Sequence, residues 1–248
     1  MKISGLTGLI IISAVVAITA VVFSLINKPM FFKTSDNVKI AYDLYEVNQP
    51  KGWLILAHMM PATKESWRDF AVELQKYGYE SLAVDLRGHG ESGGGPDGFK
   101  KFSDGEHQAS IRDLEAGWEF LKSRGAAPEK SAVIGASIGA NLSLQFAVSG
   151  APIKNIILLS PGLNYRGIIT LPLAKELENN RELLIATSKD DDDNAAESRQ
   201  LYEAAPQSIN KHLILFDRGG HGTDLLGHPE EYNLIKSIRQ FLTDGSIY

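Results

Sequence analysis

Along most of this chain, short apolar runs alternate with longer stretches in which apolar residues recur every three or four positions. Short, nearly unbroken apolar runs are typical of β-strands buried on both faces of a sheet. They occur at 53–57, 81–86, 132–134, 156–159, 183–186 and 213–216, and an earlier strand is predicted at 38–45. Strands that alternate with helices predict βαβ units, and hence an α/β fold with a mostly parallel sheet.

Three of the longer stretches place their apolar residues on one face of a helix. The first carries Trp67, Phe70, Ala71, Leu74 and Tyr77, and Gly78 ends it. The other two carry Ile111, Leu114, Trp118 and Leu121, and Leu234, Ile235, Ile238, Phe241 and Leu242. In sheets of this kind, ligands bind at the carboxyl ends of the strands. Functional residues are therefore expected in the loops that follow the strands.

The beginning of the chain has a different pattern. Gly5 to Ile26 is an uncharged run of 22 residues, which as a helix spans about 33 Å, close to the hydrocarbon thickness of a bilayer. A cleavable signal peptide is the alternative, but its apolar stretch is usually shorter and ends in a small-residue pattern that is not evident here. We therefore predict a membrane anchor over residues 1–27, followed by an α/β domain over 28–248.

The charges beside this segment do little to orient it. Lys2 lies on one side, and Lys28 and Lys33 lie on the other. Our hypothesis places the amino terminus inside the cell and the domain on the extracytoplasmic side of the membrane.

Composition limits the chemistry. The 248 residues carry a net charge of −5, without the basic footprint of a nucleic-acid-binding protein. The chain contains no cysteine, which excludes disulfides, thiolate metal sites and a cysteine nucleophile. Apolar residues make up 44% of the chain, enough for one sizeable core.

A candidate nucleophile lies directly after the strand at 132–134, where 135–139 reads Gly-Ala-Ser-Ile-Gly. In this context the G-x-S-x-G pattern indicates a nucleophile elbow, a sharp turn that lifts the Ser137 hydroxyl out of the sheet. Glycines flank the serine because larger side chains would collide with the neighbouring strand and helix. A glycine-rich turn without a catalytic role is the alternative.

A serine nucleophile needs a base, and the base needs an orienting carboxylate. His221 lies between glycines just after the last predicted strand, and it is the candidate base. The run 190–193 contains four aspartates after the strand at 183–186. Asp190 comes first after that strand and is the preferred acid, with Asp192 next. A calcium loop is the rival interpretation, but the run lacks the glycine and glutamate of an EF-hand.

The reaction also needs two backbone N–H groups that face the developing oxyanion. The Ile138 amide, directly after the nucleophile, is one candidate. The other is the Met60 amide, in the His58-Met59-Met60-Pro61 loop after the strand at 53–57. These methionines can pack against the core at the same time, because only the amide is required.

At this point the chain resembles the α/β-hydrolase superfamily over nearly all of 31–243. The likeness is carried by AHMMP at 57–61, DLRGHGES at 85–92, GASIGAN at 135–141, LLSPG at 158–162 and GGHGT at 219–223. Small bacterial esterases and dienelactone-hydrolase-like proteins are the most similar members. The resemblance implies a central sheet of about eight strands with helices on both faces, a Ser–acid–His triad, and no cofactor or metal.

Two features depart from the pattern of such proteins. Many relatives have His-Gly where this chain has His58-Met59, and dienelactone hydrolases use a cysteine nucleophile that this chain lacks. The segment from Gly162 to Asn180 is too short for a multi-helix cap, so at most a small lid is expected. Its larger side chains can line an acyl pocket or simply pack: Leu163, Tyr165, Ile168, Ile169 and Leu171.

The leading hypothesis is therefore a serine hydrolase that cleaves a carboxylic ester of a small-molecule substrate through an acyl-enzyme. Thioesterase, acyltransferase or peptidase activity on the same triad stays open, because fold and triad do not fix the substrate. A membrane-tethered binding protein without catalytic activity is the alternative from another class.

Overall fold

The structure, a computed structural model, describes residues 29–227 and 231–247. The chain divides after residue 30 into two units, and the fold described here is that of the second, Phe31–Tyr248. The predicted anchor, residues 1–27, lies outside the described residues, so it stays a prediction. Among the residues that the structure does describe, no helix is long and apolar enough to cross a membrane.

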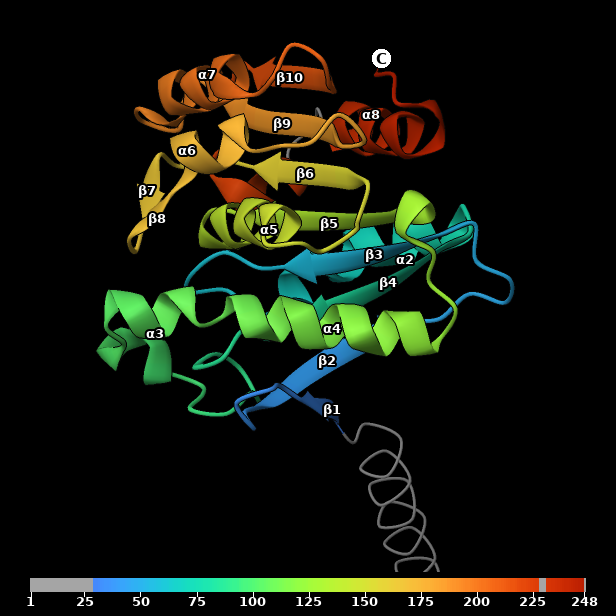
Figure 1. Ribbon diagram of the computed structural model, residues 1–248, viewed down its shortest axis with the longest axis vertical. Helices are drawn as coiled ribbons and strands as arrows, with labels where there is room; N and C mark the ends of the chain where they lie inside the picture. Colours follow the sequence, from blue (N-terminus) through green and yellow to red (C-terminus); the bar gives the residue numbers. More distant parts are fainter. Residues whose placement is uncertain (1–28, 228–230, 248) are drawn as a thin grey trace, which may run out of the picture. The chain divides into compact units, whose positions relative to one another are not determined.

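An eight-stranded sheet, in the order β1-β2-β4-β3-β5-β6-β9-β10, forms the centre of the molecule (Figure 1). The strands are β1 (Met30–Lys33), β2 (Lys39–Tyr45), β3 (Gly52–Ala57), β4 (Tyr79–Val84), β5 (Ser131–Ala136), β6 (Asn155–Leu159), β9 (Glu182–Ser188) and β10 (Asn210–Phe216). From β4 to β10 all neighbours are parallel, and β2 is antiparallel to β4. The predicted α/β fold with a mostly parallel sheet is therefore confirmed.

Helices cover both faces of the sheet. They are α2 (Arg68–Lys76), α3 (Asp104–Gln108), α4 (Ile111–Ser123), α5 (Ile138–Val148), α6 (Thr170–Lys175), α7 (Asn194–Ala204) and α8 (Glu231–Asp244). Short 3-10 turns lie at η1 (Lys64–Trp67), η2 (Gly98–Lys101), η3 (Pro128–Lys130) and η4 (Gly222–Leu226). The three predicted helices are confirmed as α2, α4 and α8.

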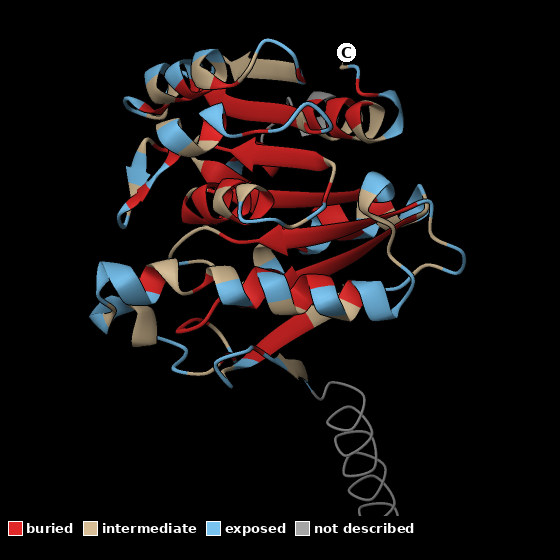
Figure 2. Ribbon diagram, viewed as in Figure 1, coloured by how far each residue is buried: buried red, intermediate tan, exposed pale blue. Residues whose placement is uncertain are grey.

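Two hydrophobic cores result, one on each face of the sheet. Successive side chains of a strand point to opposite faces, so Leu54 and Leu56 pack with α2 and α8, whereas Ile55 and Ala57 pack with α4 and α5. Every residue of β3, β4, β5 and β6 is buried, as Figure 2 shows. This double coverage explains why the central strands are nearly continuous apolar runs rather than alternating ones.

Two parts of the fold were not predicted from the pattern. The edge strand β1 is only four residues long and its two end residues are exposed, so its short Met-Phe-Phe run did not stand out as a strand. The hairpin of β7 (Asn164–Tyr165) and β8 (Ile168–Ile169) has strands of two residues each, too short for any periodicity. The hairpin and α6 make up the short segment between β6 and β9, called the lid below, and its size agrees with the expectation of at most a small lid. It lies near the carboxyl ends of the parallel strands (Figure 1).

Candidate active site

Ser137 lies between β5 and α5 in a backbone conformation that side-chain-bearing residues seldom adopt. Its φ is 54° and its ψ is −120°, a region that costs roughly 1–3 kcal/mol and persists only where the surroundings enforce it. The Ser137 N–H donates to the carbonyl of Leu159 at 2.9 Å, which ties the turn to the end of β6. The structure thus contains the strand–turn–helix elbow that the sequence predicted.

The glycines on either side of Ser137 are required by close packing. A Cβ at Gly135 would lie 2.1 Å from the carbonyl oxygen of Gly139, in the first turn of α5. A Cβ at Gly139 would lie 2.3 Å from the carbonyl oxygen of Ala57, where β3 ends. The predicted collisions with helix and strand are therefore confirmed. Because neither glycine has a side chain, α5 can lie directly against the end of β3.

His221 lies on the loop after β10, as predicted, and its side chain is one-third exposed. Both neighbours, Gly220 (φ 69°) and Gly222 (φ 60°), adopt the left-handed conformation that favours glycine. The Nδ1 atom of His221 lies 2.7 Å and 2.9 Å from the two carboxylate oxygens of Asp191. A carboxylate at Nδ1 keeps the proton on that nitrogen and leaves Nε2 free to accept one.

The expectation that Asp190 faces His221 is wrong, because the carboxylate beside the ring belongs to Asp191. Asp190 turns the other way and accepts the N–H groups of Gly219 and Gly220 at 3.1 and 3.2 Å. Hydrogen bonds from the Ser188 side chain and these amides hold the pKa of Asp190 below its ordinary value. Asp190 therefore stabilises the backbone of the loop that carries His221, whereas Asp191 pairs with the His221 ring. Asp192, the second choice, is exposed.

The two predicted oxyanion amides lie on the loop after β3 and at the start of α5. Among the described residues, neither the Met60 N–H nor the Ile138 N–H has a hydrogen-bond partner. The Met59 side chain lies against the histidine loop, where a Cβ at Gly222 would lie 2.7 Å from the Met59 sulfur. Met59 stands where many related proteins have glycine. Its side chain occupies the space beside Gly222, which has no side chain of its own.

The loop after β3 is fixed at both ends by 85–92. At its start, the buried His58 ring accepts the Leu86 N–H at Nε2 (2.9 Å), while Nδ1 lies 2.9 Å from the Met59 carbonyl oxygen. Burial, together with the neighbouring His89 ring, lowers the pKa of His58 to about 3, so the ring is neutral. At its end, the Lys64 N–H donates to the buried carboxylate of Asp85 at 2.8 Å.

Lys64 also closes this loop through its ammonium group, which is almost fully buried. Its Nζ lies 2.6 Å from Glu65, 3.2 Å from Glu91, 3.7 Å from Asp85 and 3.8 Å from Asp43. One buried cation thus joins η1 to two other parts of the chain, and the Met60 amide lies inside the closed segment.

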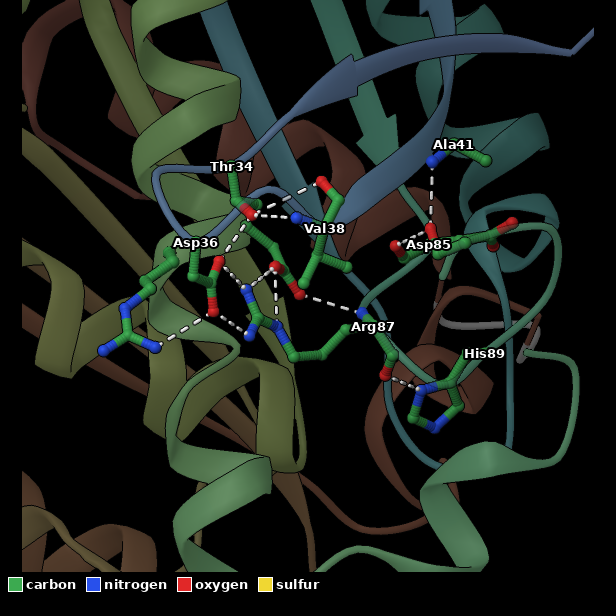
Figure 3. A network of polar contacts seen from close by, with 10 residues as sticks. Thr34, Asp36, Val38, Ala41, Asp85, Arg87 and His89 are labelled. Atoms are coloured by element: carbon green, nitrogen blue, oxygen red, sulfur yellow. Dashed lines mark hydrogen bonds and ion pairs between the residues drawn. The ribbon is translucent and has the colours of Figure 1, made fainter. Parts of the chain in front are cut away.

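The 85–92 loop is itself held by buried charge (Figure 3). The Arg87 guanidinium donates to both oxygens of Asp36 and to Oδ1 of Asp113, at distances from 2.7 to 3.0 Å. The His89 ring, at Nδ1, lies 3.1 Å from the Arg87 carbonyl oxygen and stacks on Phe99. This network ties the 85–92 loop to Asp36 and to Asp113 of α4.

Sequence reasoning missed the role of Tyr165 and Asn194. The Asn194 side-chain amide donates to the Tyr165 hydroxyl at 3.2 Å and to the Pro161 carbonyl at 3.0 Å. The Tyr165 ring meets the His221 ring edge to face, with centroids 6.3 Å apart. Ser137 is among the groups near the Tyr165 hydroxyl. Burial raises the pKa of Tyr165 above its ordinary value. The hint in the sequence was that Tyr165 belongs to the short segment expected to form at most a small lid, whose larger side chains can line an acyl pocket.

No group of three or more metal-binding side chains occurs in the described parts of the chain. The arrangement instead offers an elbow serine, a histidine–carboxylate pair on the neighbouring loops, and two unpaired amides. These features, on a sheet of this order, define an α/β-hydrolase.

The comparisons with known proteins agree. The family model described as serine aminopeptidase, S33, matches residues 48–181, and the chain belongs to this family of α/β-hydrolases. The match includes Ser137 and the loop after β3 but ends before Asp191 and His221. None of the curated proteins matches the chain.

Several solved structures share the fold. A predicted CIB-like hydrolase from Thermoplasma acidophilum is 18% identical, with a TM-score of 0.66, over 87% of this chain and 97% of its own. An esterase from Pyrococcus furiosus is 22% identical, with a TM-score of 0.71, over 88% and 91%. An enol-lactonase from Burkholderia xenovorans is 14% identical, with a TM-score of 0.67, over 87% and 100%.

Proposed function

We propose that this hydrolase cleaves a carboxylic ester of a small molecule through an acyl-enzyme on Ser137, with His221 as base and Asp191 as orienting carboxylate. The observation that carries the proposal is the pairing of His221 Nδ1 with Asp191 at 2.7 Å, on the loops that follow β9 and β10. These loops stand beside the elbow because β9 follows β6, and β6 follows β5, in the sheet.

The proposed reaction has two halves. His221 Nε2 takes the Ser137 proton while the oxygen attacks the ester carbonyl, and the Met60 and Ile138 amides donate to the oxyanion. His221 then gives the proton to the departing alcohol oxygen as the carbon–oxygen bond breaks. Water repeats the sequence on the acyl-enzyme, releasing the acid and regenerating Ser137.

Covalent labelling tests this proposal. The full chain in detergent is treated with a fluorophosphonate probe, which reacts with activated serines. We expect labelling of the wild type and of Ser149→Ala, which changes an exposed serine at the end of α5. We expect no labelling of Ser137→Ala. Equal labelling of all three proteins, or of none, would contradict the proposal and would favour a binding protein without catalytic activity.

Peptidase activity is the second candidate, because the matching family is described as serine aminopeptidases. The same triad can attack an amide when the site binds the amino end of a peptide. Turnover of alanine p-nitroanilide and of p-nitrophenyl butyrate can be compared at equal enzyme concentration. Faster turnover of the anilide would replace esterase by aminopeptidase as the proposed activity.

We also propose that residues 1–27 anchor the enzyme in a membrane with its catalytic domain on the extracytoplasmic side. The support is the uncharged run of 22 residues from Gly5 to Ile26. A reporter that is active only outside the cytoplasm, fused to the carboxyl terminus, is expected to be active. A silent reporter would contradict this orientation.

A further inference from the structure

The Tyr165 hydroxyl has a position that packing alone does not explain. Its ring closes over Gly162, where a Cβ would lie 2.5 Å from the ring carbon that carries the hydroxyl. Its oxygen accepts the Asn194 amide at 3.2 Å, so the phenolic proton is free to point elsewhere. Asp191, Glu197 and Ser137 are near this side chain, and the His221 ring meets its ring edge to face. The hydroxyl therefore keeps a proton that it can donate, and it lies on the side of the site that holds His221.

Two buried asparagines keep the tyrosine in place. Asn141, one turn after Ser137 on α5, donates to the carbonyls of Gly162 and Ile168 and accepts the Gly162 N–H, at 3.0 to 3.1 Å. Asn194, three residues after Asp191, holds the Pro161 carbonyl and the Tyr165 hydroxyl. The segment that carries Tyr165 is therefore tied to the nucleophile helix α5 and to the start of α7.

The order of the sheet shows which side of Ser137 the tyrosine occupies. β3 and β6 lie on opposite sides of β5. The Met60 amide follows β3, whereas Tyr165 follows β6 and is held by a residue that follows β9. Tyr165 thus comes from the side of the elbow opposite the Met60 loop, the side of His221, which protonates the departing group in the proposed reaction. A donor there meets the leaving-group oxygen, not the carbonyl oxygen.

We propose that Tyr165 is a catalytic residue whose hydroxyl donates a hydrogen bond to the leaving-group oxygen of an oxygen ester. This inference rests on the proposed function. The leaving oxygen takes its proton from His221 and the electron pair of the breaking carbon–oxygen bond, while Tyr165 keeps its own proton throughout. Because burial raises the pKa of Tyr165, the hydroxyl stays protonated at neutral pH. Such help matters most for alkoxide leaving groups and little for sulfur, a weak acceptor.

The test measures leaving-group selectivity in the full chain. Tyr165→Phe keeps the ring over Gly162 and removes only the hydroxyl. We expect kcat/KM to fall by roughly 10- to 100-fold on ethyl butyrate. It should change little on S-ethyl thiobutyrate and on p-nitrophenyl butyrate, whose leaving group needs no assistance. Tyr202→Phe, on the half-buried tyrosine of α7, is the matched control and should resemble the wild type on all three substrates.

A structural role for Tyr165 gives a different pattern. An equal loss on all three substrates, or no loss on any, would overturn the inference, while Ser137→Ala still reports on the proposed function independently. Thermal unfolding and fluorophosphonate labelling of Tyr165→Phe establish that the variant is folded and that its serine is intact. Preserved labelling together with a selective loss on ethyl butyrate supports the inference.

Discussion

The two flanks of Ser137 are built differently. The oxyanion flank is the loop after β3, residues 58–64. The neutral, buried His58 and the buried Lys64 fix this loop to residues 85–92. On the lid flank, which comprises 160–170 with Asp191, Asn194 and His221, most contacts are amide and hydroxyl hydrogen bonds. The lid also leaves Ile169 54% exposed.

This difference matches the role that the proposed mechanism gives to each flank. Oxyanion stabilisation depends on donors fixed in advance where charge develops, whatever the substrate is. In the proposed reaction the lid flank meets the variable parts of the substrate, where hydrogen bonds that rearrange at modest cost suit different leaving groups. We infer that mutations on the oxyanion flank lower stability and catalysis together, whereas most lid-flank mutations change selectivity.

The largest effect is expected for the carboxylate of the lid flank. Asp191→Asn removes the charge that holds the His221 tautomer, and kcat is expected to fall about 10³- to 10⁴-fold. Asp190→Asn keeps an oxygen that accepts the Gly219 and Gly220 amides, so its kcat should stay close to the wild-type value. Ester hydrolysis by the two variants measures the difference. A larger loss in Asp190→Asn would return the acid role to Asp190.

Lys64→Met tests the buried charge of the oxyanion flank. Removing the ammonium leaves the buried Asp85 carboxylate without its cation, and we expect a loss of about 3 kcal/mol in the free energy of unfolding. The exposed lysine of α2 provides the control, because Lys76→Met breaks only a surface pair with Glu73 and should leave stability unchanged. Urea unfolding measures both variants. Equal stability of Lys64→Met and Lys76→Met would contradict the inference that buried charge stabilises the oxyanion flank.

A pair of glycines compares the flanks directly. Gly139→Ala places a Cβ 2.7 Å from the His58 carbonyl oxygen of the oxyanion flank and 2.3 Å from that of the preceding Ala57. We expect a loss of about 1–3 kcal/mol in stability with reduced kcat. Gly167→Ala, in the lid turn, meets chiefly the flexible end of the Gln108 side chain. It strains a backbone with φ 78°, so stability falls somewhat while kcat is retained. A retained kcat in Gly139→Ala would argue against a rigid oxyanion flank.

The last expected effect is a pH dependence from His58, which acts on stability only at acidic pH. Its pKa is about 3 in the folded chain and 6.5 ordinarily, so between these values the unfolded chain binds more protons. Stability therefore rises with pH up to about 6.5 and is lost as the pH falls toward 3, by at most about 1.4 kcal/mol per pH unit.

His58→Gln keeps an acceptor for the Leu86 N–H and should flatten this slope in urea unfolding between pH 4 and pH 7. The neighbouring His89, whose pKa burial also lowers, stays in the variant and accounts for part of the remaining slope. An unchanged slope would show that His58 is not the neutral support of the oxyanion flank.

The sequence by itself determined the features that depend on local pattern. Buried strands follow from apolar runs, and Ser137 and His221 are marked by flanking glycines that their sharp turns require. The small lid follows from the length of the segment between β6 and β9.

Only the tertiary structure decided which neighbouring side chains meet. Asp190 and Asp191 are adjacent and chemically identical, and the path of the chain after β9 alone decides which carboxylate reaches His221. The same holds for Tyr165, because its ring meets His221 and its hydroxyl meets Asn194 through packing between segments that follow different strands. Local pattern encodes the backbone, whereas contacts between distant loops depend on how the whole sheet is assembled.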